Sequence, residues 1–131
     1  MGRDKEQNSR KNPEAIDHAR FVQLLTDEFP EVPQAFDEYR KGLLHCEMGA
    51  FARLTEEAMD RGRFWQAEKY FNLIERVREN ATPEVENAID VSYIEYLAFS
   101  EVTENRLQAM KRMPRAIRAI LLEIDGRGRW A

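Results

Sequence analysis

The segment "EVENAIDVSYIEYLAF", residues 84–99, decides the fold class, because its apolar residues recur at helical spacing on more than one side. One predicted stripe consists of Val85, Ala88, Ile89, Ser92, Tyr96 and Phe99. A second consists of Val91, Ile94 and Ala98. A helix that is apolar around most of its axis is typical of the centre of a domain, so we expect this helix to be largely buried.

Two acids interrupt this apolar segment. Asp90 and Glu95 are the only charged residues between Ala88 and Phe99. Because a buried carboxylate must be paired or hydrogen-bonded, we expect at least one of them to contact an arginine, a lysine or a helix-end amide of its own chain. The alternative role is a general acid with a raised pKa. No nucleophile or base accompanies the two acids in the sequence, which favours the structural role.

The rest of the chain predicts a single all-α domain of five or six helices, because no alternating apolar run is bounded by turn residues. The expected helices span 13–29, 33–61 as one helix or two, 64–77, 84–99, a stretch from Ser100 or Thr103 to Met113, and 115–124. Their boundaries follow from Pro13 after the cap Asn12, Pro30, Gly62, Thr82 before Pro83, and Pro114. "FPEVP", residues 29–33, is expected to be a short corner, and Gly42 and Gly49 to share one helical face.

The two ends of the chain differ from its body in composition. Residues 1–12 are polar and charged, which predicts a disordered tail before a helical domain over 13–125. The end, "DGRGRWA", predicts a frayed, flexible and solvated tail over 126–131. Trp130 as an anchor for a partner is the alternative role for that tail.

Charge is distributed unevenly over the 131 residues, whose net charge is −4. Residues 13–114 hold 12 basic and 20 acidic groups, a net charge of −8. Such a body repels nucleic acid and favours basic partners. Between Glu75 and Glu104, eight acids stand against Arg76 and Arg78. These acids form either an ordinary solvated surface or a docking face for a basic protein.

Several chemistries lack a sequence signature. Cys46 is the only cysteine, which excludes an intrachain disulfide and favours a reducing compartment. No apolar run reaches transmembrane length and the start lacks a signal peptide's apolar region, so we expect a cytoplasmic protein without a membrane partner. "DGRGRW" lacks the strand–loop–helix setting of a phosphate loop.

The run "LHCE", residues 44–47, does not predict a metal site. Neighbouring residues of a helix diverge by about 100°, so His45, Cys46 and Glu47 cannot converge on one ion. His18, the other histidine, adds no ligand spacing. A packed Cys46 and a half-buried His45 are the expected roles, with no metal and no cofactor.

Residues 48–77 resemble one tetratricopeptide helical hairpin. The matching residues are Phe51, Leu54, Gly62, Phe64, Ala67 and Phe71. The pattern departs at Thr55 and Ala58, and such repeats normally occur in at least about three copies. Three longer stretches, "LLHCEMGAFARLTEEAMDRGRFWQAEKYF", "EVENAIDVSYIEYLAF" and "MPRAIRAIL", together resemble a family of small bacterial helical proteins associated with immunity in toxin systems. That resemblance covers residues 20–124 and implies binding without catalysis.

These observations predict a non-enzymatic protein-binding module, of the immunity type, in which an acidic helical face occludes a basic partner such as a toxin. The expected contact residues are Glu79, Glu84, Glu86, Glu101 and Glu104, with Trp65 or Tyr93 as an exposed aromatic anchor. One alternative is a scaffold that holds a peptide in a groove lined by Phe51, Phe64, Tyr70 and Phe71. Another is a small enzyme that uses Asp90, Glu95 and His45.

Overall fold

The structure, a computed structural model, describes residues 14–131, so the tail predicted over 1–12 and the helix start at Pro13 lie outside it. The helices are α2 (His18–Glu28), α3 (Glu31–Gln34), α4 (Leu44–Asp60), α5 (Phe64–Glu79), α6 (Pro83–Ala88), the π-helical turn η1 (Ile89–Ile94), α7 (Glu95–Ala98), α8 (Glu104–Met110) and α9 (Arg115–Asp125). α6, η1 and α7 form one continuous helix, so the described chain holds seven helices. It contains no strand, only an isolated bridge between Ile16 and Ala81. The predicted all-α class is confirmed.

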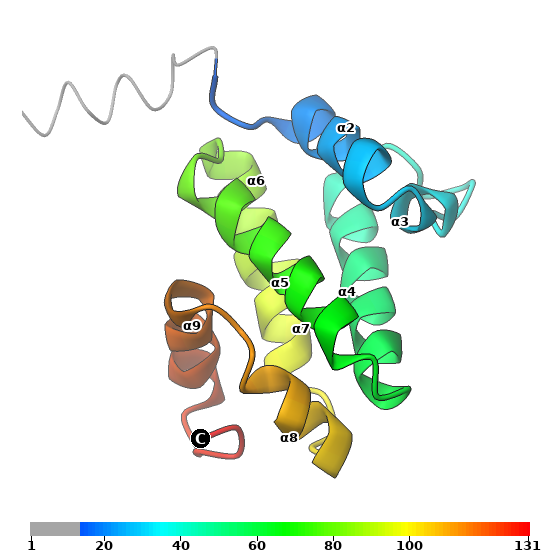
Figure 1. Ribbon diagram of the computed structural model, residues 1–131. Coiled ribbons are helices and arrows are strands. Elements are labelled where there is room, and N and C mark those ends of the chain that lie inside the picture. The colour runs from blue at the N-terminus through cyan, green and yellow to red at the C-terminus, as the bar shows by residue number, and fades with distance from the viewer. Residues whose placement is uncertain (1–13) are drawn as a thin grey trace, which may run out of the picture.

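Three long helices form the centre of the domain (Figure 1). α4 and α5 make an antiparallel hairpin, and the continuous helix Pro83–Ala98 packs along α4. α2 and α3 cover one end of this layer, while α8 packs on α4 and α5 and α9 on η1 and α7. A single apolar core joins all of these elements.

The prediction that residues 84–99 form a central helix is confirmed, but its buried face differs from the expected stripes. The buried residues are Val85, Ala88, Ile89, Tyr93, Ile94, Leu97 and Ala98. A π-helical turn holds one residue more than an α-helical turn, and η1 therefore moves the buried positions one residue along the chain. Tyr93 and Leu97 point inward where Ser92 and Tyr96 were expected, and Tyr96 and Phe99 lie at the surface.

Local signals predict most helix ends correctly. Gly62 follows α4 with φ of +71°, a conformation that glycine adopts without strain. The Thr82 hydroxyl accepts a hydrogen bond from the Val85 amide at 3.4 Å, with Pro83 in the first turn. Thr103 caps α8 in the same way, although α8 ends at Met110 and not at Met113. Pro114 separates α8 from α9.

The region between Pro30 and Leu44 corrects two expectations. The expected corner is the short helix α3, and neither one nor two helices span 33–61, because residues 35–43 form turns before α4 begins. Gly42 lies in this connection with φ of +93° and so shares no helical face with Gly49. The Gly42 amide donates to Glu47 Oε2 at 2.8 Å, which holds the connection against the first turn of α4.

The first described helix begins later than expected. Asp17 is its N-cap, with Oδ1 accepting from the Arg20 amide at 2.8 Å. Before this cap, the chain is extended rather than helical: the Ile16 amide donates to the Asn80 carbonyl at 2.8 Å, and its carbonyl accepts from the Thr82 amide at 3.0 Å. These bonds tie the start of the domain to the α5–α6 connection.

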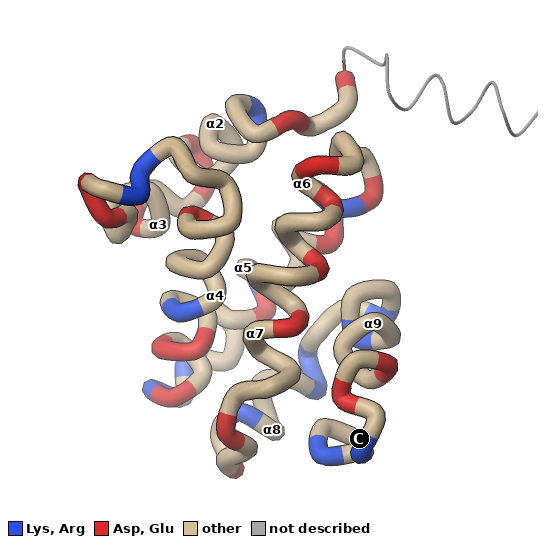
Figure 2. The backbone as a smooth tube through the Cα atoms, turned by 180° about the vertical axis from the view of Figure 1, so that it is seen from behind, with Lys and Arg blue, Asp and Glu red and all other residues tan. Residues whose placement is uncertain are grey.

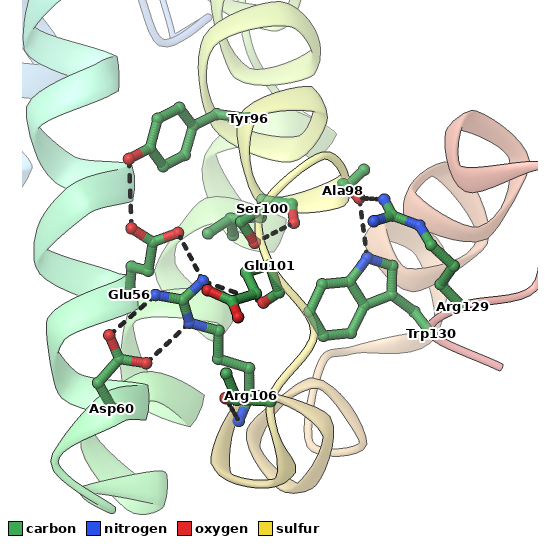
Figure 3. Close-up of polar contacts among 11 residues, drawn as sticks. Glu56, Asp60, Tyr96, Ala98, Ser100, Glu101, Arg106, Arg129 and Trp130 are labelled. Atoms are coloured by element: carbon green, nitrogen blue, oxygen red, sulfur yellow. Dashed lines mark hydrogen bonds and ion pairs between the residues drawn. The ribbon is translucent and has the colours of Figure 1, made fainter.

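The expectation of a frayed and solvated end is wrong for Trp130, which is 1% exposed. Its indole nitrogen donates to the Ala98 carbonyl at 2.9 Å, and Arg129 donates to the same carbonyl (Figure 3). Asp125 accepts from the Trp130 amide at 3.2 Å and pairs with Arg129 at 3.1 Å. The last residues therefore supply donors to a carbonyl that the end of α7 leaves free.

Candidate functional site

The outer side of η1 and α7 carries a patch of large apolar side chains that no other part of the described chain covers. Val91 is 46%, Tyr96 37% and Phe99 63% exposed. Together with Glu95 we call these residues the aromatic face. His45, Gly49 and Ser92 complete the lining of a shallow depression between α4 and this helix.

The π-helical turn is the reason why this face exists. In an uninterrupted α-helix Tyr96 and Phe99 would follow Ile89 on the buried side. The additional residue in η1 turns both outward and keeps the remainder of the helix in the core. Single π-helical turns inside α-helices occur frequently at functional sites, so we take the aromatic face beside η1 as the candidate functional site.

A polar network holds Tyr96 in place (Figure 3). Its hydroxyl donates to Glu56 Oε1 at 3.2 Å, and Glu56 lies 3.5 Å from the Arg106 guanidinium. Arg106 also binds Asp60 with two hydrogen bonds of 2.7 and 2.9 Å and donates to the Glu101 carbonyl. The hydrogen bond to Glu56 restrains the Tyr96 ring, and a side chain that is already ordered loses less conformational entropy when it makes a contact.

The same network makes part of the stability dependent on pH. The hydrogen bond from Arg106 lowers the pKa of Asp60 below its usual 3.8. Because the folded pKa is the lower one, the stabilisation is complete above 3.8 and is lost as the pH falls through the folded value. We expect Asp60→Asn to lower the free energy of unfolding at pH 7, and the difference from wild type to vanish well below 3.8. Urea unfolding across this range would measure it, and a difference independent of pH would contradict the prediction.

Asp90 and Glu95 have different surroundings. Asp90 receives two hydrogen bonds from Arg78, at 2.8 and 3.0 Å, which confirms that at least one of these acids binds a base of its own chain. Within residues 14–131, no ion pair or hydrogen bond engages the Glu95 side chain. Glu95 is half-buried among Val91, Tyr96 and Phe99, so an apolar patch surrounds one carboxylate without a counter-charge.

We expect Asp90→Ala to destabilise the fold by about 1–2 kcal/mol, because it leaves a partly buried guanidinium without its bidentate partner. Glu86→Ala is the matched control, since Glu86 is 3.7 Å from the same Arg78 and more exposed. We expect that change to cost less than about 0.5 kcal/mol. Equal stability of the two variants in urea unfolding would contradict the structural role of Asp90.

His45 and Glu95 line the same depression, whereas Asp90 lies with Arg78, so the three residues of the enzymatic alternative are not brought together. His45 is exposed rather than half-buried, and its Nδ1 is hydrogen-bonded to Ser92 Oγ at 2.7 Å. Among the described residues no carboxylate hydrogen-bonds to the other ring nitrogen, so the orienting acid of a nucleophilic triad is lacking. Nor does the described chain bring together three side chains suited to holding a metal ion.

The five acidic contact candidates are exposed and lie in two groups. Glu79, Glu84 and Glu86 lie at the α5–α6 connection, and Glu101 and Glu104 lie before and at the start of α8. Figure 2 shows acidic segments beside α6 and beside α8, at opposite ends of the domain. The continuous helix between them is about 24 Å long at the usual rise of about 1.5 Å per residue. The two acidic groups therefore lie about one helix length apart, and their joint contact with one partner stays a prediction.

The aromatic candidates also divide. Trp65 is 58% exposed, as expected for an anchor that contacts a partner. Lys69 Nζ lies 4.6 Å from the centroid of its ring. The expectation that Tyr93 is exposed is wrong. Tyr93 is fully buried, and its hydroxyl lies 2.7 Å from Thr55 Oγ1. Burial raises the pKa of Tyr93, so it stays protonated. Tyr96, which the regular helical spacing placed on the buried side, lies at the surface instead.

The peptide groove proposed for the scaffold alternative is filled by the core. Phe51, Tyr70 and Phe71 are buried, and Phe64 is half-buried. The Phe51 and Tyr70 rings pack edge to face with centroids 5.2 Å apart. The Tyr70 hydroxyl donates to Glu31 at 2.7 Å, and burial raises the pKa of Tyr70 to about 12. Phe51, Tyr70 and Phe71 therefore pack inside the hairpin and are not available to a peptide.

Glu47 is a buried acid whose role the sequence did not predict. Its side chain is 4% exposed; Oε1 lies 2.5 Å from His18 Nε2, and Oε2 accepts from the Gly42 amide. One carboxylate therefore connects α2, the α3–α4 connection and α4. The available signal was the helical spacing that places Glu47 beside Met48 and Phe51 on the buried side of α4.

Comparison with protein families decides the relationship of the chain. Residues 22–128 match the family described as Domain of unknown function (DUF7674). The chain belongs to the DUF7674 family. No match was found among curated proteins or among solved structures. The DUF7674 description names no activity. Within the described residues of this DUF7674 chain, no helix has the length and apolar character needed to cross a membrane.

Proposed function

We propose that this DUF7674 protein is a non-enzymatic protein-binding module whose aromatic face covers a basic and apolar segment of a partner protein. One observation carries the proposal: Val91, Tyr96 and Phe99 are exposed around Glu95, which has no counter-charge among the described residues. Exposed apolar contacts supply binding free energy, and a cation opposite Glu95 supplies specificity.

The chemistry of the face favours this partner over other classes. Rigid aromatic side chains near the centre of an interface contribute most of its binding energy, and Tyr96 is held rigid through Glu56. The acidic body, with its net charge of −8 over residues 13–114, attracts a basic protein and repels nucleic acid. Immunity-type inhibition of a toxin in the cytoplasm, by occlusion of a basic groove, is the specific form that we propose.

The test is quantitative capture of partners from the native host by four baits. Wild type and Trp65→Ala should retain the same protein, because Trp65 lies on α5 outside the aromatic face. A Glu95→Lys/Phe99→Ala variant should lose it, while Glu84→Lys/Glu86→Lys should retain it. Both charge variants alter exposed or half-buried side chains and should remain folded.

Kinetics with the captured protein then separate charge from contact. Its association rate should fall as salt rises from about 0.1 M to 1 M, because the Debye length falls from roughly 10 Å to 3 Å. Phe99→Ala should mainly raise the dissociation rate. Loss of capture by Glu84→Lys/Glu86→Lys or by Trp65→Ala, with Glu95→Lys/Phe99→Ala unaffected, would contradict the proposal.

A further inference from the structure

Phe99 separates two depressions of opposite charge. On one side lies the depression with Glu95, His45 and Tyr96. On the other lies a second depression, lined by Phe99, Ile124, Asp125, Gly126, Arg127 and Arg129. The exposed ring of Phe99 is common to both, so the two form one continuous surface with an aromatic ridge between them.

The second depression holds two arginines, of which only Arg129 has a partner in the part of the chain that the structure describes. Arg129 is committed to Asp125, at 3.1 Å, and to the Ala98 carbonyl. Arg127 is exposed, and within residues 14–131 its guanidinium takes part in no ion pair or hydrogen bond. Across the ridge, the half-buried Glu95 has no partner either. The surface therefore presents an unpaired acid, an exposed aromatic ring and an unpaired base.

This arrangement is complementary to itself. A two-fold axis brings the same patch of each subunit face to face, so that residue i meets residue j and residue j meets residue i. With the axis at Phe99, the acid of each copy lies opposite the base of the other. The two Phe99 rings meet at the centre, and Val91, Tyr96 and Ile124 lie around them.

We propose that the occupant of this surface is a second copy of the chain, in a symmetric dimer in which Glu95 of each protomer pairs with Arg127 of the other across a Phe99 contact. A second copy supplies both missing charges and the apolar cover at once. The inference goes beyond the proposed function: it adds self-association on an overlapping face, so a heterologous partner must displace the second copy.

Charge exchange tests the dimer with the protein alone. Sedimentation velocity should show the wild-type chain associating reversibly into a dimer below about 1 mM. Glu95→Arg and Arg127→Glu should each weaken the dimer at least about tenfold, because each places two like-charged pairs in the interface. Mixing the two single variants, or combining both changes in one chain, should restore association. The mixed pair forms one contact with the native charges and one with the charges exchanged, and the double variant forms both contacts with the charges exchanged.

Phe99→Asp should also abolish the dimer, and Trp65→Ala, with a comparably exposed aromatic on α5, should leave it intact. A wild-type chain that is monomeric at about 1 mM overturns the proposal. So does a dimer that ignores the single charge variants, or one that the mixed variants fail to restore. Each of these results leaves the capture experiment unaffected, so failure of the dimer and failure of the proposed function are distinguishable.

Discussion

Trp130→Ala is expected to lower the free energy of unfolding by about 3–5 kcal/mol, the usual cost of removing a buried tryptophan. Trp130 is 1% exposed, and its removal would leave a cavity where the core contacts the end of α7. The Ala98 carbonyl would also lose the indole donor at 2.9 Å and keep only Arg129. Urea unfolding followed by far-ultraviolet circular dichroism measures the difference.

Trp65→Ala is the control for this prediction, because it removes the same side chain from a position that is 58% exposed. A surface substitution of this kind should change stability by less than about 0.5 kcal/mol. A Trp130→Ala protein as stable as wild type would mean that the end of the chain does not belong to the core.

The second large effect is expected for Glu47→Ala, at about 2–4 kcal/mol of destabilisation. The substitution leaves the Gly42 amide without its acceptor and His18 without the carboxylate at 2.5 Å. Because Glu47 connects three segments, amide hydrogen exchange should accelerate in α2 and in residues 35–43 more than in α5.

Glu57→Ala is the matched control, since Glu57 pairs with Arg61 at 2.9 Å across an exposed turn of the same helix. Such surface pairs contribute about 0–1 kcal/mol. If Glu47→Ala and Glu57→Ala behaved alike, Glu47 would not hold α2 and the α3–α4 connection to the core.

Features with local causes were predictable from the sequence. Gly62, Thr82 with Pro83, Thr103 and Pro114 act through the backbone of their own neighbours, and each ends or begins a helix as expected. The binding of Asp90 to a base of its own chain was also predictable, because an apolar helix cannot leave both of its acids unpaired.

Features with distant causes were not predictable. Trp130 packs in the core and contacts the end of α7, 32 positions away, although its neighbours have the composition of a solvated tail. The hairpin matches in residues 48–77 correspond to a real pair of helices, but a pattern of that length did not indicate whether Phe51 and Tyr70 line a groove or pack in the core.

The candidate site depended on one such feature. Regular α-helical spacing predicts Tyr96 and Phe99 on the buried side of residues 84–99, and no glycine or proline in the segment marks the π-helical turn. Regular spacing therefore predicts an exposed Tyr93 as anchor, and the predicted acidic contacts lie at both ends of the helix. In the structure Tyr93 is buried and Tyr96 is exposed. Glu95, for which the sequence predicts an internal partner or an acid role, lies in the centre of the exposed patch.

Site-specific photo-crosslinking in the native host tests the aromatic face most directly. A photoreactive phenylalanine analogue would replace Phe99 in one chain and Trp65 in another, both at comparably exposed positions. The account predicts a crosslink from position 99 to a basic protein, alongside any crosslink to a second copy, and none to that protein from position 65. A basic protein crosslinked from position 65 and never from position 99 would contradict it.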